Sequence, residues 1–365
     1  MLTCNYRNKL WNLLIIGLLS HINYYAIAQV NPPISHDNST MYINHEKESI
    51  LDHLTEFDMS QLLIETNLED LFNDRRVKNY KHAVATFTFN DGCQWTDSLE
   101  VKVRGVYRAA KCDNPPLKIK YSKKLLKARG LKKRNEYKIV YPCKNNETYQ
   151  NYIYKEYLIY KLYNELTDKS LRVHLIDFAL QDVTQKTETV QTTGFIIEHR
   201  EEIIKRLDAV KNDMRCLPAK MLSPDDYTLF QVFQFMIGNV DWLIENCKNA
   251  EVIQLQDKTV IPIPYDFDYT GMVNPEYAKP IAKYKQRIVP DRYFLGHKKK
   301  LKDLLPIFEL FKDKKDTFIN IVDSFEQLPK KERKAMLKYL RSFYKILDRP
   351  NEVKRIFIDD VEDIK

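Results

Sequence analysis

The first half of the chain alternates between apolar and polar positions, a pattern that predicts β-strands. Residues 83–89 alternate strictly, Asn90-Asp91-Gly92 then supplies a turn, and the following segment returns as a second strand. Residues 60–141 therefore predict a mostly antiparallel sheet. Its predicted strands are 62–65, 83–89, 97–106, 117–121 and 137–141, with one short helix at 67–72.

The spacing of apolar residues becomes helical after residue 150. Ile153, Tyr157 and Tyr160 recur at helical spacing and predict a helix over 152–166. Ser223-Pro224-Asp225 is a start signal for an apolar helix that ends at Gly238. The remaining expected elements are strands at 173–183 and 194–198, a hairpin of 251–255 with 259–264, and two or three amphipathic helices within 298–347. The predicted fold class is α+β, with a β-rich N-terminal lobe at 57–200 and a mainly helical C-terminal lobe at 201–365.

The N-terminus has the order of a secretory signal. Arg7 and Lys9 precede the apolar run 10–19, and Ala26-Ile27-Ala28 follows as a cleavage site, so residues 1–28 are predicted to be a signal peptide. An uncleaved membrane anchor is the alternative. Residues 29–56 are polar, contain Pro32-Pro33, and predict a flexible linker. We expect export to the periplasm, the outer surface or the extracellular space.

Charge and cysteine content add two expectations. The formal net charge is +8, and loss of Arg7 and Lys9 with the signal peptide leaves +6, a basic excess that suits anionic partners. Nucleic acid is not expected, since export removes the usual partner. The six cysteines include no C-x-x-C pair, which argues against structural zinc. In an oxidising compartment Cys112 and Cys143 could pair, and a fully reduced set is the alternative.

Candidate chemistry begins where the apolar helix ends at Gly238. Asp241 follows in a loop and fits the carboxylate that orients and deprotonates an acceptor hydroxyl in phosphoryl transfer. Such a centre also needs an oxygen ligand for Mg²⁺ further along the loop. Asn249, at the start of the next strand, fits that role, with Asn246 as the alternative.

Two further carboxylates follow the hairpin, in Tyr265-Asp266-Phe267-Asp268. Mg²⁺ prefers one or two carboxylates together with phosphate oxygens and water. Asp266 is the first expected metal ligand and Asp268 the second, because side chains two apart in an extended chain point the same way. Each motif alone is weak, and a turn or a solvated pair is the alternative for each. Their order, with a catalytic Asp, a downstream Asn and then Asp-x-Asp, matches the catalytic and metal loops of kinases.

The first half supplies candidate phosphate ligands. Arg104 and Arg108 flank a glycine at a strand end, and arginine suits bidentate contact with phosphate. Lys118 and Lys120 lie on one face of a strand, where a phosphate-pairing lysine is expected. The other expected residues are Glu156, as the acid that positions such a lysine, and Glu198, as a hinge marker or a partner of a neighbour such as Arg200.

Residues 118–134 contain nine basic residues and no acid, which predicts either a solvated loop or contact with an anionic surface.

Several common sites are absent from the sequence. It contains neither G-x-x-x-x-G-K-[ST] nor G-x-G-x-x-G, and only eight glycines, which disfavours P-loop enzymes and glycine-rich nucleotide loops. It also lacks H-E-x-x-H and G-x-S-x-G, so zinc protease and serine hydrolase chemistry have no starting point.

Five segments carry a family resemblance, over about residues 60–295: 101–105, 115–118, 137–140, 238–242 and 263–271. They resemble a group of exported, mostly uncharacterised bacterial proteins related to the CotH-type (spore coat) atypical kinases, and the second half resembles HipA-type kinases more distantly. The resemblance implies a two-lobed kinase-like fold, with Asp241 as the catalytic acid/base and Asp266 as a metal ligand. The spacing in the CotH and HipA patterns favours Asn246 as the metal-binding amide, whereas the exported group favours Asn249.

The leading hypothesis is therefore an exported, CotH-like, Mg²⁺-dependent kinase. It would transfer a phosphoryl group from ATP or another nucleotide to an unknown hydroxyl-bearing substrate, which is a protein, a glycan or a small molecule. The His that often follows the catalytic Asp in such kinases is replaced by Trp242-Leu243-Ile244. The alternative is accordingly an inactive pseudokinase that acts as an exported binding or surface-assembly protein.

Overall fold

The computed structural model describes residues 48–56, 59–133, 135–212, 214–284 and 286–361. The predicted signal peptide 1–28 and residues 29–47 of the predicted linker lie outside this range. Within it, no helix combines the length and the apolar character needed to cross a bilayer.

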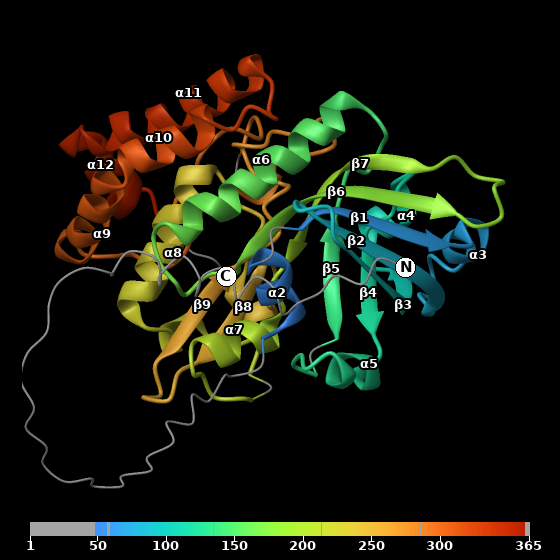
Figure 1. The fold of residues 1–365 in the computed structure, drawn as a ribbon. Coiled ribbons are helices and arrows are strands. Elements are labelled where there is room, and N and C mark those ends of the chain that lie inside the picture. Colours follow the sequence, from blue (N-terminus) through green and yellow to red (C-terminus); the bar gives the residue numbers. More distant parts are fainter. Residues whose placement is uncertain (1–47, 57–58, 134, 213, 285, 362–365) are drawn as a thin grey trace, which may run out of the picture.

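Seven strands form a closed barrel in the order β1-β2-β3-β4-β5-β7-β6 (Figure 1). Every neighbouring pair is antiparallel except β1 and β6, which run parallel and close the barrel. The predicted antiparallel sheet is thus extended by two later strands into a closed structure. The strands are β1 Met59–Thr66, β2 Lys81–Phe89, β3 Gln94–Val103, β4 Leu117–Tyr121, β5 Glu136–Val140, β6 Val173–Asp182 and β7 Val190–Ile197.

The alternation of the sequence fills the interior of this barrel. On β2, Ala83, Ala85 and Phe87 are buried, while the residues between them are partly exposed. The aromatic rings of Tyr121 and Tyr137 reach the same interior from β4 and β5. Closure removes sheet edges that would otherwise expose unpaired backbone groups.

Residues 50–56 form helix α2 (Ile50–Glu56), whereas the sequence predicted a flexible linker up to residue 56. Ile50, Leu51 and Leu54 are buried among the residues of the barrel core. A surface linker cannot bury three large aliphatic side chains, so the folded part of the chain begins earlier than the sequence indicated.

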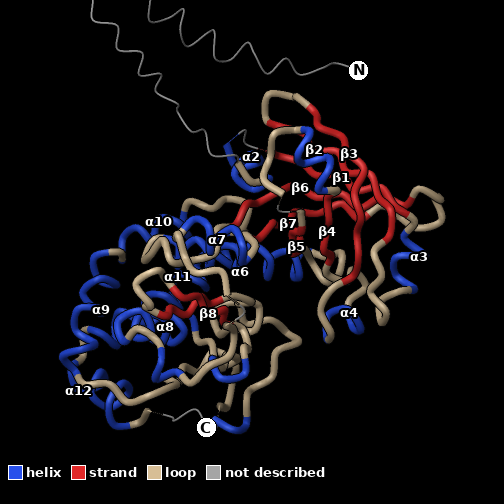
Figure 2. Tube along the Cα trace, turned by 90° about the horizontal axis from the view of Figure 1, so that it is seen from below, coloured by secondary structure: helices blue, strands red, loops and turns tan. Residues whose placement is uncertain are grey.

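The second half builds a separate hydrophobic core from helices. Helix α6 (Glu147–Asn164) contacts β6 and β7 on one side and α10 on the other, so it lies between the barrel and the helical part (Figure 1). Figure 2 shows the strands of the barrel gathered at one end of the molecule and most helices at the other. The elements of this part are α8 Pro224–Ile237, β8 Ala250–Gln254, β9 Val260–Pro264, α9 Leu301–Asp313, α10 Lys315–Asp323, α11 Lys330–Leu347, α12 Pro350–Lys354 and the π-helical turn Arg355–Asp359. The short helices are α3 Leu68–Asn73, α4 Tyr107–Lys111, α5 Lys123–Ala128, α7 Arg200–Arg206, η1 Ala219–Met221, η2 Ile244–Asn246 and η3 Ala282–Tyr284.

Local capping explains where the predicted boundaries moved. Helix α6 begins at Glu147 rather than Tyr152, because the Asn146 side chain accepts a hydrogen bond from the Tyr149 amide at 3.0 Å. Helix α8 begins after Ser223 and ends at Gly238, as predicted. The mixed α+β class, with a β-rich first part and a helical second part, is confirmed, whereas the division into two lobes stays a prediction.

The packing of α2 gives a first prediction. Leu51→Ala should lower the free energy of unfolding by about 2–4 kcal/mol, because it opens a cavity in the barrel core. Thr55→Ala, on the exposed face of the same helix, is the control and should change stability by less than about 1 kcal/mol. Denaturant unfolding measures both, and equal small effects would show that α2 does not belong to the core.

Candidate functional site

The segment after β9 places two aspartates on either side of a buried aromatic ring. Phe267 is fully buried, with its ring centroid 4.6 Å from that of Tyr160 and 5.8 Å from that of Phe233. Asp266 adopts a left-handed backbone conformation (φ 61°), and its amide donates to the Tyr160 hydroxyl at 2.9 Å. The strand-like geometry expected for this pair is therefore wrong, since Asp266 is not extended. Anchoring of Phe267 instead leaves Asp266 exposed and Asp268 half-buried.

The two carboxylates nevertheless interact. Burial and the negative charge of Asp266 raise the pKa of Asp268 to about 6, against the opposing effect of Arg108. The Tyr277 hydroxyl donates to Asp268 Oδ2 at 3.1 Å. Asp241 contributes a further small upward shift, which places it in the same electrostatic environment.

Arg104 and Arg108 bring positive charge to these carboxylates from the barrel. Arg104 directly follows β3, and its amide donates to the Pro116 carbonyl at 2.8 Å. Arg108 lies in α4 and donates to the Tyr141 carbonyl at 2.9 Å. Burial lowers the pKa of Arg104, although Asp266 and Glu156 act against it. For Arg108 the surrounding acids, Asp268 foremost, outweigh burial and raise the pKa.

A disulfide between Cys112 and Cys143 fixes the segment that carries Arg108. Cys112 is the C-cap of α4, and Cys143 follows closely on Tyr141, which Arg108 contacts. The pairing that the sequence suggested is thus present. Its effect is to hold α4 against the end of β5.

Glu156 is the acid at the centre of this cluster. It extends from α6, is 1% exposed, and interacts electrostatically with both arginines and with Asp266 and Asp268. Burial, reinforced by the two aspartates, raises the pKa of Glu156 well above its ordinary value.

Two buried atoms of the cluster have no hydrogen-bond partner among the described residues. They are Nε of Arg104 and Oε2 of Glu156. A buried polar atom without a partner costs free energy, so these two atoms could each accept or donate a further hydrogen bond to a ligand without losing a protein contact.

The Asp241 loop meets the Asp266 loop through backbone hydrogen bonds. Gly238 ends α8 in a left-handed conformation (φ 68°), and its carbonyl accepts from the Gly271 amide at 3.0 Å. The Tyr265 amide also donates to the Asn249 carbonyl, at 3.2 Å. The structure therefore brings Asp241, Asn249 and the Asp266 segment into one region, as the order of the motifs predicted.

Within its loop, Asp241 has close partners. Its carboxylate forms an ion pair with Lys248 and accepts from the Asn249 amide group at 3.1 Å. The Asn249 side chain also donates to the Asp241 carbonyl at 2.6 Å. Asn246 lies exposed at the end of η2 instead. Of the two amides considered for metal binding, Asn249 is the one that contacts Asp241.

Two contacts anchor the stretch between Asp241 and Lys248 to the rest of the fold. Trp242 is 2% exposed and packs on Phe230, with ring centroids 4.9 Å apart. Cys247 forms a disulfide with Cys216, a pairing that the sequence did not suggest. Trp242 thus serves as a structural anchor for this stretch.

Lys118 and Lys120 lie apart from this cluster. Both project from the outer face of β4, where Lys118 pairs with Glu136 and Lys120 with Glu100, each at 2.7 Å. The sequence did not point to Lys138, on the neighbouring strand β5, as a candidate phosphate ligand. Its ammonium lies 5.3 Å from the centroid of the Tyr265 ring, and it forms no ion pair within the described residues. Burial lowers its pKa, as does Arg104, against the effects of Glu251 and Asp266.

Lys138 differs from Lys118 and Lys120 only in what its strand, β5, packs against. All three occupy outward positions of an alternating strand, but Lys138 and Val140 face the helical part, where Val140 joins the second core. The local sequence signal is identical for all three, so the alternation alone could not select Lys138.

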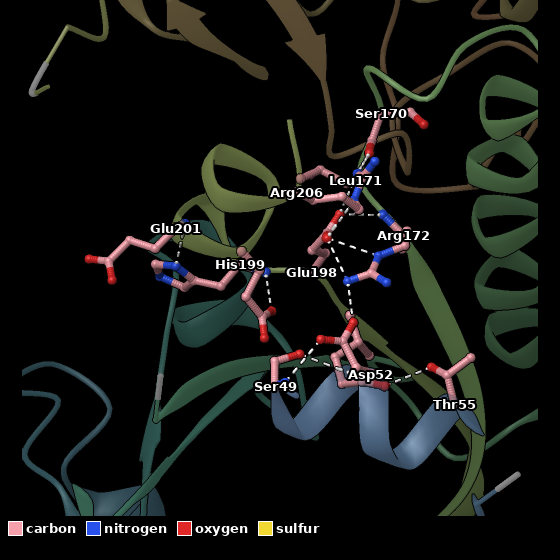
Figure 3. A network of polar contacts seen from close by, with 12 residues as sticks. Ser49, Asp52, Thr55, Ser170, Leu171, Arg172, Glu198, His199, Glu201 and Arg206 are labelled. Atoms are coloured by element: carbon pink, nitrogen blue, oxygen red, sulfur yellow. Dashed lines mark hydrogen bonds and ion pairs between the residues drawn. The ribbon is translucent and has the colours of Figure 1, made fainter. Parts of the chain in front are cut away.

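Glu198 belongs to a separate ion-pair network (Figure 3). Its carboxylate is fully buried and accepts from Arg172 Nε at 2.9 Å and from Arg206 Nε at 3.0 Å. Arg172 extends the network to Asp52 of α2, at 2.9 Å. The expected alternative partner, Arg200, pairs with Glu251 instead. Glu198 thus ties α2, β6 and α7 together.

Two cavities lie outside the charged cluster. One of about 480 Å³ adjoins the Glu198 network and is lined by Asp52, Lys132, Arg172, Glu202 and Arg206, among others. The other, of about 330 Å³, lies between α6 and α11 and is lined by Asn151, Lys155, Gly271, Glu332 and Tyr339, among others. Only the second one touches a segment of the candidate site.

The donor set also limits the metal that could bind. Within the described ranges no three His, Cys, Asp or Glu side chains form a metal-binding group. Asp266 and Asp268, with a nearby amide, match the sparse protein ligation typical of Mg²⁺, which takes its other ligands from phosphate and water. The residues present therefore fit a magnesium–nucleotide complex better than a metal held by protein alone.

Comparison with known proteins adds little to this geometry. No protein-family model and no curated protein matches the chain. Among solved structures it is similar to the crystal structure of a Helicobacter pylori proinflammatory kinase, CtkA, with a TM-score of 0.38 and 11% identity over 71% of this chain and 91% of that chain. At these values the similarity is too low to infer a shared fold or activity.

The Asp266–Asp268 interaction predicts a specific titration. Half of the Asp268 side chains should be protonated at a pH of about 6. Asp266→Asn should lower this midpoint, because it removes a neighbouring negative charge that disfavours ionisation. Carboxyl ¹³C NMR measures both values. A midpoint that Asp266→Asn leaves unchanged would show that the two side chains do not interact.

The Glu198 network predicts a large effect on stability. Glu198→Ala should lower the free energy of unfolding by about 3 kcal/mol, because it leaves two arginines without their buried counter-charge. Glu188→Ala, in the exposed turn between β6 and β7, is the matched control and should stay within about 0.5 kcal/mol of wild type. If both variants unfold at the same denaturant concentration, the network does not stabilise the fold.

Proposed function

We propose that this chain is an exported, Mg²⁺-dependent atypical kinase related to the CotH type, which transfers a phosphoryl group from a nucleotide to a hydroxyl-bearing acceptor. The observation that carries the proposal is the cluster in which Arg104 and Arg108 of the barrel face Glu156, Asp266 and Asp268. Phosphoryl transfer requires cations for the phosphate oxygens and carboxylates for a metal within one site.

The barrel side of the cluster would bind the phosphates. Arg104 has a buried Nε without a partner, and guanidinium groups bind phosphate oxygens in a bidentate manner. Lys138 lies next to Arg104 and Asp266 and takes the role first considered for Lys118. Glu156, which lies within electrostatic range of Arg104, would help to position it.

The helical side would hold the metal and the acceptor. Asp266, Asp268 and Asn249 would ligate Mg²⁺, which when bound neutralises charge on the transferring phosphate. Asp241 would orient the acceptor hydroxyl and accept its proton. Lys248, paired with Asp241, would hold that carboxylate in position for the acceptor.

A second function is favoured by the partners of Asp241. Its carboxylate is engaged by both Lys248 and Asn249, and Trp242 replaces the usual His. These contacts suit a pseudokinase that binds a nucleotide or a cation without transfer and serves as an exported binding or surface-assembly protein.

Nucleotide binding tests the site that both functions share. Calorimetry should show that ATP binds only with Mg²⁺, and that Arg104→Gln weakens binding by about tenfold to hundredfold, the cost of one charge-assisted contact. Asp266→Asn should weaken the Mg²⁺-dependent binding of ATP, because it removes an expected metal ligand. The matched controls are Lys81→Gln and Asp177→Asn, whose charges lie elsewhere on the barrel strands β2 and β6, and both should bind as wild type.

Transfer of labelled phosphate separates the two functions. In a kinase, Asp241→Asn should reduce turnover by at least about a hundredfold while nucleotide affinity stays unchanged. Magnesium-dependent binding without any transfer in wild type would favour the pseudokinase. If wild type binds no nucleotide, the kinase proposal is wrong.

A further inference from the structure

The exposed face of α11 carries a continuous row of cations. It consists of Lys331, Lys334, Lys338, Arg341 and Lys345, all of them exposed. Steps of three and four residues keep side chains on one side of a helix. The row therefore extends for about 21 Å along the helix, with a positive charge about every 5 Å. We call it the α11 basic stripe.

No acid of the described residues pairs with this stripe. None of the five cations forms an ion pair or a side-chain hydrogen bond with any other residue of the described part of the chain. The acid of the same helix, Glu332, is half-buried and pairs instead with Lys155 of α6 at 2.7 Å. The opposite face of α11 is buried in the helical core through Met336, Leu340 and Phe343.

The basic run 118–134 differs from the stripe, although the sequence made it the more prominent of the two. Four of its cations are paired, as Lys118 with Glu136, Lys120 with Glu100, Arg129 with Asp97, and Lys132 with Asp52. Pairing reduces the field that these four cations project into solvent, while Lys123, Lys124 and Lys127 of the run stay exposed without an ion pair among the described residues. The α11 basic stripe differs in that all five of its cations are unpaired and lie along one face of a single long helix.

The chemistry of the stripe selects one kind of anionic partner. A helix that inserts into a membrane exposes an apolar face, but no exposed large hydrophobic side chain of the described residues lies on α11. Single-stranded nucleic acid is held by exposed aromatic rings that stack on its bases, and the stripe has none. Four of its five cations are lysines, which attract charge without the planar geometry of phosphate recognition. Evenly spaced point charges along one helix face suit a linear polymer with carboxylates along its length.

We propose that the α11 basic stripe binds a linear acidic polysaccharide and thereby holds the exported protein at a surface that displays such a polymer. The inference rests on the proposed export but not on phosphoryl transfer, because the stripe shares no residue with the Asp241 and Asp266 loops. The binding is electrostatic and weakens as salt is added.

Affinity for polygalacturonate, a soluble carboxylated polysaccharide, tests the proposal with the full mature chain. Wild type should bind at low ionic strength. The triple variant Lys334→Glu, Lys338→Glu, Arg341→Glu should bind at least about tenfold more weakly, because it reverses the field at the centre of the stripe. The matched control reverses three exposed cations of α5, Lys123→Glu, Lys124→Glu and Lys127→Glu, and should lose less than about threefold. An unchanged melting temperature confirms that each variant is folded.

Several results would overturn this assignment. If both triple variants lose affinity equally, attraction follows net charge rather than the stripe. If wild type does not bind the polymer at low ionic strength, the stripe is an ordinary solvated face. Tighter, α11-dependent binding to single-stranded oligothymidylate, or to phosphatidylcholine vesicles containing phosphatidylglycerol, would assign the stripe to nucleic acid or to a membrane instead.

Discussion

The structure depends above all on a cluster of charged side chains that lies where the barrel meets the helical part. Glu156 is almost completely buried without a full set of hydrogen bonds, and Arg104 and Arg108 oppose only part of the burial effect that raises its pKa well above the ordinary value. The arginines in turn need the acids of the Asp266 segment. Neither half could bury its charges alone, so the cluster couples the barrel to the helices and leaves polar atoms available for a ligand.

The loops that carry these charges are each restrained by other means. One disulfide holds the end of α4, which presents Arg108, and the second holds the loop that follows Asp241. Phe267 fixes the Asp266 segment from the hydrophobic core. Preorganised charges of this kind keep their positions without a bound ligand, as the proposed phosphate site would require.

Much of the fold could be predicted from the sequence, because strand alternation and helix spacing are local. The order of Asp241, Asn249 and Asp266 was also visible, and the backbone contacts of Gly238 with Gly271 explain why motifs separated along the chain converge. Lys138 could not be distinguished from Lys118, since both are outward residues of alternating strands and only the packing of β5 against the helical part separates them. The sequence did not predict helix α2 for a similar reason. Its short apolar run indicates a buried helix only when the barrel that it packs against is known.

Charge on the surface shows the same limitation. Four of the nine basic residues of 118–134 are paired with acids from other elements, whereas none of the five cations of the α11 basic stripe is paired within the described residues. The central claim, however, concerns the cluster of Arg104, Glu156 and Asp266 and whether it binds phosphate. A crystal structure with Mg²⁺ and a non-hydrolysable nucleotide answers it most directly. The account predicts the metal on Asp266 and the terminal phosphates beside Arg104, whereas a nucleotide bound elsewhere, with this cluster unchanged, would contradict it.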